Sequence, residues 1–400
     1  MNIINERFFH FLWENLHFSA GKLKTTCGKD VHVIHPGTSN KGDGPDYTFA
    51  HLRFDTLSVY GDIELHLHNN DWYHHGHHKD PVYNRVILHV IPQYSRRSIP
   101  AASADNTRIP TLELLPYLPE KLFQLWKRFQ LPDVLPCAGL MKTMPSSVFS
   151  GIVKQWDSRY FEYRCSRLLS DYPAGTKMHL AWNYMVTLHM TEGLGYYNNR
   201  QNMRLLGMEL VKNKRYSSLY NEKVIQETTR FLFEKAGLSE PVSSQSILQK
   251  QEWDLSSTRP NNRPEVRIPQ AAELYFRLKS IPLSTWINEP TLSLWEKISR
   301  FQFTAPIGKN RLQTLFVNTL LPAVYLLAGW LHQRDKSIEA LSLWEQQRIP
   351  IPPFVRKKFK ASNFPDDSLY NRLSGLHHYR YHCQPRKCED CEVMKYLVKT

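Results

Sequence analysis

The sequence has few cysteines and no long, uninterrupted apolar segment. Six cysteines among 400 residues are too few for a disulfide framework, which indicates a reducing compartment. The first 18 residues carry charged side chains among their aromatic ones, so they lack the continuous apolar core of a signal peptide. The longest apolar run, residues 315–331, contains Pro322 and two polar residues and predicts a buried, kinked helix. We therefore expect a cytoplasmic protein with no membrane partner.

Two common enzyme motifs are missing as well. The HExxH pair of zinc proteases does not occur. Gly308 and Lys309 open a predicted helix, but the upstream glycine of a P-loop is absent, which excludes binding of a nucleoside triphosphate there. The hydrophobic content of 42% is that of a globular protein, and 400 residues predict two or three domains.

Basic residues, by contrast, are abundant. The chain has 51 Lys and Arg residues against 37 Asp and Glu residues, a formal net charge of +14 and a pI near 9.4. An excess of this size favours a polyanionic partner, DNA or RNA before a membrane surface. The alternative is a soluble protein that is basic without binding a polyanion, and charge alone barely separates the two.

Histidines and carboxylates are concentrated between residues 42 and 91, where eight of the 18 histidines lie. The run GDIELHLH, residues 61–68, alternates with a period of two and predicts a strand. One face of this strand would carry the metal-ligand side chains Asp62, Glu64, His66 and His68, and the other face would be apolar. Residues 86–91 are continuously apolar and predict a buried strand.

The acids of this segment are spaced as a metal-dependent phosphodiesterase requires. Pro45 and Asp46 lie in a predicted turn that places Asp46 at the end of a strand. Asp46 and Glu64 could hold one divalent cation, Mg²⁺ or Mn²⁺, as its metal ligands. His66 shares the face of Glu64 and could position or activate water. We therefore predict that Asp46, Glu64 and His66 are the catalytic residues.

This order of motifs resembles the PD-(D/E)xK nuclease superfamily over about the first ninety residues. The resemblance implies a restriction-endonuclease-like α/β core, built from a helix, a three-stranded meander, a helix and a further strand. That superfamily usually has lysine where this chain has His66. Some of its members add an acid on the opening helix, the position of Glu14 here.

Four segments resemble a bacterial family of unknown function over nearly the whole chain. The resemblance implies relatives and supplies no activity. The segments are the opening NERFFHFLWENLHF, the block GPDY with GDIELHLHNNDWYHHGHHKDPVYNRVILHVI, the loop STRPNNRPEVRI and the C-terminal CxxxxCxxC.

Three functional hypotheses follow from these motifs. The first is a Mg²⁺- or Mn²⁺-dependent nuclease, which requires Asp46 to approach Glu64 closely. The second is a non-catalytic nucleic-acid-binding or scaffold protein with a degenerate nuclease-like core, in which the polar face of the strand is simply solvated. The third is a zinc hydrolase that uses the histidines of residues 74–78, and it requires His66, His74 and His77 to converge on one point.

Substrate contacts are predicted in two places. Arg259, Arg263 and Arg267 lie on a proline-bounded loop, where they could hold phosphates bidentately, although a solvated loop with structural arginines is the alternative. Trp72 and His77 follow the candidate catalytic strand and are further candidates for contact with substrate.

The periodicity changes from two to 3.6 after residue 119, which predicts a mostly helical remainder. The expected fold class is α+β, with an α/β domain over residues 1–110, helical domains over 111–380 and a cysteine-rich tail over 381–400. Cys383, Cys388 and Cys391 in this tail could bind Zn²⁺, with His382 as a further ligand. Their spacing faintly resembles the iron–sulfur loop of helix-hairpin-helix glycosylases, which needs a fourth cysteine. Reduced surface thiols are the alternative.

Overall fold

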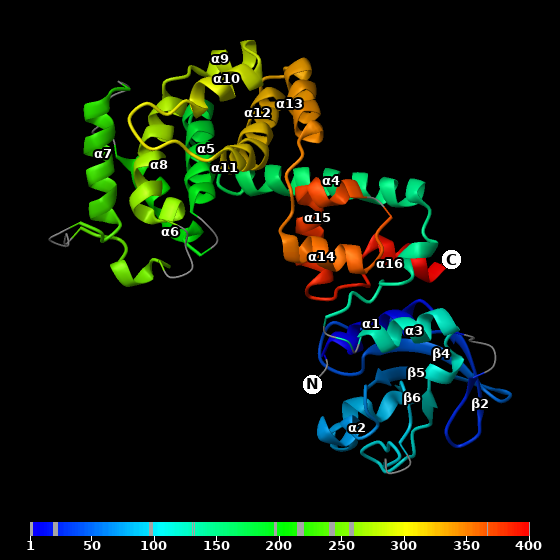
Figure 1. Ribbon diagram of the computed structural model, residues 1–400. Helices are drawn as coiled ribbons and strands as arrows, with labels where there is room; N and C mark the ends of the chain where they lie inside the picture. The colour runs from blue at the N-terminus through cyan, green and yellow to red at the C-terminus, as the bar shows by residue number, and fades with distance from the viewer. Residues whose placement is uncertain are drawn as a thin grey trace. The chain divides into compact units, whose positions relative to one another are not determined.

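Seven strands of the N-terminal region form one mixed sheet (Figure 1). The computed structural model describes residues 3–18, 23–95, 99–129, 131, 133–195, 198–213, 220–239, 245–255, 260–365 and 367–399. The chain is 57% helical and 11% strand, with the sheet-rich region first and helices after it. This arrangement confirms the predicted mixed α+β class.

The strand order of the sheet is β1-β2-β4-β5-β6-β7, with β3 paired to β4. Strands β2, β4 and β5 form an antiparallel meander, whereas β6 pairs parallel to β5, and β7 parallel to β6. The strands are β1 (Leu23–Lys24), β2 (Asp30–His35), β3 (Thr38–Ser39), β4 (Tyr47–Phe54), β5 (Leu57–Leu65), β6 (Val86–Ile91) and β7 (Thr111–Glu113). The structure therefore confirms the buried strand predicted at residues 86–91.

The crossover from β5 to β6 is short and irregular. It consists of one helical turn, α2 (Asp71–His74), and two 3-10 segments, η1 (His77–Lys79) and η2 (Pro81–Arg85). These short turns stand where the resemblance to the nuclease superfamily implies one helix before the last strand. Gly76, with φ of 80°, reverses the backbone between α2 and η1, a conformation that glycine adopts without strain. This reversal lets the residues on either side of Gly76 turn toward the same strand end.

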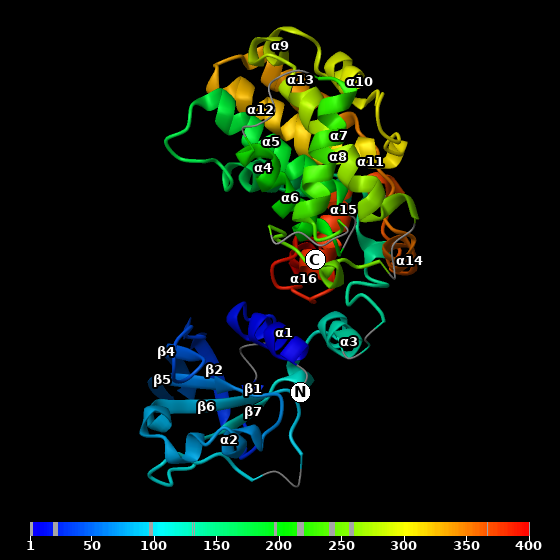
Figure 2. The ribbon, with the colours of Figure 1, turned by 90° about the vertical axis from the view of Figure 1, so that its left-hand side faces the viewer.

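Aromatic side chains pack the helices α1 (Ile3–Glu14) and α3 (Glu120–Phe129) against each other. Phe8 stacks on Phe129 with ring centroids 4.3 Å apart, and Phe9 meets Trp126 edge-on with centroids 5.7 Å apart. The two views in Figures 1 and 2 place α1 and α3 along one face of the sheet and α2 on the other. The sheet is therefore covered on both faces, and its core residues are apolar on each side.

The chain forms two units that interleave in sequence. The sheet unit comprises Met1–Val153, Ile351–Tyr370 and Gly375–Thr400, and the helical unit comprises Lys154–Pro350 and Asn371–Ser374. The sheet extends past the predicted boundary at residue 110, because Thr111–Glu113 pairs with β6. The C-terminal elements of the sheet unit include α14 (Pro353–Ala361), η9 (Tyr379–Cys383) and α16 (Glu392–Lys399).

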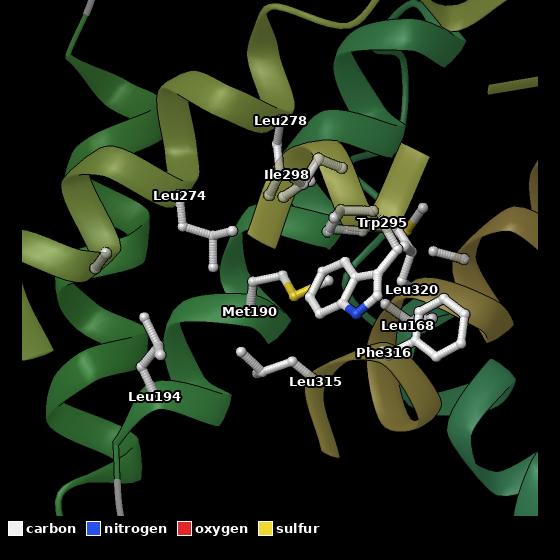
Figure 3. Close-up of a cluster of buried hydrophobic side chains, with 14 of the residues drawn as sticks. Leu168, Met190, Leu194, Leu274, Leu278, Trp295, Ile298, Leu315, Phe316 and Leu320 are labelled. Carbon is white, nitrogen blue, oxygen red and sulfur yellow. The ribbon is translucent and has the colours of Figure 1, made fainter. Parts of the chain in front are cut away.

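The helical unit has its own hydrophobic core, part of which Figure 3 shows around Trp295, Met190 and Leu315. The continuous helical stretch Lys309–Trp330 crosses this core and is long and apolar enough to span a membrane, but 61% of its most apolar window is buried inside the protein. A π-helical turn at Phe316–Leu320 interrupts it. The helices are α4 (Ser146–Leu169), α5 (Met178–Leu194), α6 (Arg200–Lys212), α7 (Glu222–Lys235), α8 (Pro264–Lys279), α9 (Leu283–Asn288), α10 (Thr291–Ser299), α11 (Lys309–Leu315), α12 (Leu321–Trp330) and α13 (Arg334–Gln346).

Candidate metal centre

The two predicted carboxylates meet at the end of β5. The backbone N–H of Asp46 donates to Oε2 of Glu64 at 3.0 Å, and the N–H of Leu65 donates to Oδ2 of Asp46 at 2.9 Å. Each acid is thus fixed by the backbone that carries the other. This reciprocal bonding holds the start of β4 against the end of β5, so the two acids lie on the same side of the sheet.

Three imidazoles lie together beside the second oxygen of Glu64. Nε2 of His77 lies 3.1 Å from Oε1 of Glu64, and Nε2 of His66 lies 3.4 Å from the same oxygen. Nδ1 of His75 lies 3.2 Å from Nε2 of His66. The three ring nitrogens all lie within 4.8 Å of one another. The imidazole nitrogens of His66, His75 and His77 therefore form one cluster, and Glu64 contacts two of the three.

A layer of buried side chains orients these imidazoles. Nδ1 of His66 is hydrogen-bonded to Nε2 of His89 at 2.9 Å, which leaves Nε2 of His66 aimed at Glu64. The ring of Tyr83 stacks on His77 with centroids 3.8 Å apart. Trp72 packs edge-on against His77 and donates from its indole nitrogen to the carbonyl of Ala102 at 2.8 Å. Such support of a metal ligand by a partner on its other nitrogen is the usual arrangement in metal sites.

The site is largely removed from water, although one side remains open. Glu64 and His66 are 5% and 2% exposed, whereas His75 is exposed. Burial raises the pKa of Glu64 to about 9, and the negative charge of Asp46 adds to this effect. Burial also raises the pKa of Asp46 to about 6. The pKa of His66 is lowered by burial and then by the neighbouring imidazoles. Without a cation, burial therefore keeps Glu64 and His66 uncharged at neutral pH.

The donor set fits a transition-metal cation. Nε2 of His77 is buried and makes no hydrogen bond, although it faces Oε1 of Glu64. A buried nitrogen without a hydrogen-bond partner lowers the stability of the fold unless another partner, such as a metal ion, binds it. Three imidazole nitrogens with one carboxylate oxygen suit Zn²⁺, Mn²⁺ or Fe²⁺ better than Mg²⁺, which prefers oxygen ligands.

One protein family matches this chain. The sequence model of the family described as "Protein of unknown function (DUF2851)" matches residues 6–238, more than half of the 400 residues. The chain belongs to the DUF2851 family. No curated protein and no solved structure matches it. The matched range contains all four donor residues of the candidate metal centre, so the centre lies within the part that the family defines.

The structure distributes the predicted histidines of this DUF2851 chain unevenly. His66 and His77 join the centre, but His74 is exposed and lies 3.5 Å from Asp71 instead. His75 takes the place that the zinc hypothesis gave to His74. The predicted solvated polar face is also wrong, because Asp62, Glu64 and His66 are buried while His68 is exposed. The α2–η1 segment folds back over this face and covers it.

The residues predicted to contact substrate lie mostly in structural positions. Trp72 is 0% exposed and hydrogen-bonded to a backbone carbonyl, so it packs beneath the centre and offers no surface to a base. Arg267 is buried and donates to Gln270 at 2.8 Å, which makes it part of the packing at the start of α8. Arg263 is exposed and directly precedes α8, so its side chain is open to solvent, whereas Arg259 lies outside the described residues.

The predicted tail cysteines do come together. Cys383, Cys388 and Cys391 line one small cavity in the sheet unit, and His382 lies at it as well. A fourth cysteine, Cys137, lines the same cavity.

Four important residues escaped the sequence analysis. His75 and His89 lie within the histidine-rich segment, so density of histidine pointed to the region without selecting them. His10 of α1, whose Nε2 lies 3.9 Å from Oδ2 of Asp46, and Cys137 are distant from their partners in sequence. No local pattern could have found these two.

Proposed function

We propose that this chain is a metal-dependent hydrolase that cleaves phosphodiester bonds in nucleic acid. The observation that carries the proposal is the cluster of the His66, His75 and His77 nitrogens, two of which lie within 3.4 Å of one carboxylate oxygen of Glu64, directly beside the second acid, Asp46. Paired acids next to a cation are the common equipment of phosphodiester hydrolysis.

The order of elements supports the nuclease hypothesis. Helix α1 precedes the antiparallel meander β2-β4-β5, and a crossover containing α2 leads to β6, parallel to β5. This order is similar to the one that the resemblance to PD-(D/E)xK nucleases implies, except that short helical turns stand where the second helix is expected. Asp46 at the start of the middle strand and Glu64 near the end of the third lie where that resemblance requires its acids. The net charge of +14 also favours a polyanionic substrate.

Each side chain has a role in this proposal. Glu64, His66, His75 and His77 would hold the cation, which would polarise a phosphoryl oxygen when bound. Asp46, with a pKa of about 6, is mostly ionised at neutral pH and can accept the proton of an attacking water. His89 would keep His66 in the tautomer that directs Nε2 to the cation. The exposed side at His75 is the way in for substrate.

The nitrogen-rich donor set favours a second candidate, a zinc hydrolase that acts on a substrate other than nucleic acid. The same four donors serve both functions, and only the substrate differs. The hypothesis of an inactive binding or scaffold protein would leave the donors in place without turnover.

A cleavage assay separates these candidates. Single- and double-stranded DNA and RNA, and a panel of carboxylic and phosphate esters, are incubated with the protein and Mg²⁺, Mn²⁺ or Zn²⁺. We expect Mn²⁺- or Zn²⁺-dependent cleavage of nucleic acid, reduced at least ~100-fold by His75→Ala. The matched control is His74→Ala, which removes the exposed neighbour of His75 and should keep full activity.

Two results would contradict the proposal. Metal-dependent hydrolysis of esters without cleavage of nucleic acid would leave the zinc hydrolase in its place. Tight binding of nucleic acid with no turnover under any metal would support the scaffold protein instead.

A further inference from the structure

Four of the six cysteines gather in the sheet unit, far from the histidine centre in sequence. Cys137 lies in the loop after α3, Cys383 ends η9, and Cys388 and Cys391 flank the turn that precedes α16. All four line one small cavity. The backbone N–H of Cys391 donates to the carbonyl of Cys388 at 3.1 Å, so these two sulfurs project from one tight turn. A Cys-x2-Cys turn of this kind is a common half of a metal site.

The four thiols are buried together without forming disulfides. Each of the six cysteines is free, and Cys137, Cys388 and Cys391 are 7 or 8% exposed. Burial raises the pKa of Cys383 well above its usual value, and the neighbouring thiolates of Cys391, Cys137 and Cys388 raise it further. Each of these sulfurs therefore lies within electrostatic reach of the others. A cation bound by the four sulfurs as thiolates would explain why four cysteines line one cavity.

We propose that Cys137, Cys383, Cys388 and Cys391 are the four ligands of one soft metal centre. A tetrathiolate set selects zinc or an iron–sulfur cluster. The buried His378 supports the set, because its Nε2 lies 3.4 Å from Sγ of Cys391 and can donate a hydrogen bond to that sulfur. This proposal is independent of the hydrolase function, since it shares no residue with the histidine centre.

The centre would connect two remote segments of the sheet unit. Arg386, between Cys383 and Cys388, already donates to the backbone carbonyls of Phe129 and Leu131, just before Cys137. A metal bound by Cys137 and the three C-terminal cysteines would fasten the same two segments covalently. Because loop closure is costly in the unfolded chain, a clip between residues so distant in sequence should stabilise the unit strongly.

The full chain, purified without oxygen, provides the test. Metal analysis and native mass spectrometry should find either about four irons with equal acid-labile sulfide, or one zinc, per chain. In Cys137→Ser, retention of this metal under a chelator should fall by more than the roughly 10- to 100-fold that loss of a supporting hydrogen bond costs. Cys165→Ser is the matched control, because Cys165 is equally buried and free but lies outside the cavity.

Thiol labelling of the wild-type chain keeps the proposal testable if Cys137→Ser fails to fold. The four cavity cysteines should resist alkylation until the metal is removed and should then react together, whereas the exposed Cys27 should react at once and the buried Cys165 should stay protected in both states. A metal-free chain, a disulfide among these cysteines, or a Cys137→Ser variant that retains metal as the wild type does would overturn the proposal.

Discussion

Substitution of a candidate metal ligand should stabilise this protein when metal is absent. Glu64 is buried with a pKa of about 9 against an ordinary value of 4.5. Between these values the folded protein keeps Glu64 protonated while the unfolded chain ionises it. The free energy of unfolding of the metal-free protein therefore falls as pH rises from about 4.5 to about 9. Glu64→Gln removes this loss and keeps a carbonyl oxygen that can accept the hydrogen bond from the N–H of Asp46.

The size of the effect follows from the pKa. At pH 7 the solution is about 2.5 pH units above the ordinary pKa of Glu64, and each unit lowers the free energy of unfolding by 1.36 kcal/mol. The loss of stability that Glu64→Gln removes is therefore at most ~3 kcal/mol. Because Asp46 titrates in contact with Glu64, a gain of roughly 1–3 kcal/mol is the expected range. For a unit of about 200 residues, this corresponds to a rise in Tm of ~2–10 °C.

Thermal denaturation in a strong chelator measures this gain between pH 4 and pH 9. Glu64→Gln should match the wild type near pH 4 and exceed it increasingly toward pH 9. With saturating Mn²⁺ or Zn²⁺ the order should reverse, since only the wild type keeps the carboxylate ligand. Glu14→Gln is the matched control, because Glu14 is exposed on α1 and its loss should change stability by less than ~0.5 kcal/mol. A Glu64→Gln variant less stable than the wild type at pH 8 without metal would refute the reasoning.

Three further predictions concern the same region. Metal binding at pH 7 should release about one proton, because Glu64 must ionise; calorimetry in buffers of different ionisation enthalpy measures it, and a buffer-independent heat would contradict it. His66→Lys should lose metal affinity together with cleavage rate in titration and kinetic assays, whereas full activity with a changed pH profile would show that His66 replaces the usual lysine. Gly61→Ala should cost about 2 kcal/mol in chemical denaturation, because its Cβ would lie 2.3 Å from Cγ2 of Ile87; an unchanged midpoint would disprove this close packing of β5 and β6.

The local patterns of the sequence were sufficient for the fold class and for one part of the centre. The two-residue period of residues 61–68 placed Glu64 and His66 on one face of a strand, and in the structure Nε2 of His66 lies 3.4 Å from Oε1 of Glu64. The same pattern could not show that this face is buried. Its cover comes from α2 and η1, and the contact depends on tertiary folding.

The remaining errors have a similar cause. The sequence could not select His75 over His74, because that choice depends on the backbone reversal at Gly76. The reversal lies outside any regular helix, so no side-chain period predicts it. Trp72 was predicted to contact substrate because it follows the candidate catalytic strand, yet it fills the core beneath the centre. Cys137 is separated from its three partners by most of the chain, so spacing within the tail could only predict an incomplete set of ligands.

The most direct test of the histidine centre is a crystal structure of the wild-type protein soaked in Mn²⁺, with anomalous diffraction data. The proposed function predicts one anomalous peak, about 2.0–2.2 Å from Oε1 of Glu64 and from the ring nitrogens of His66, His75 and His77. A peak held by Asp46 and Glu64 alone, away from His75 and His77, or no peak at these residues at saturating Mn²⁺, would contradict this assignment.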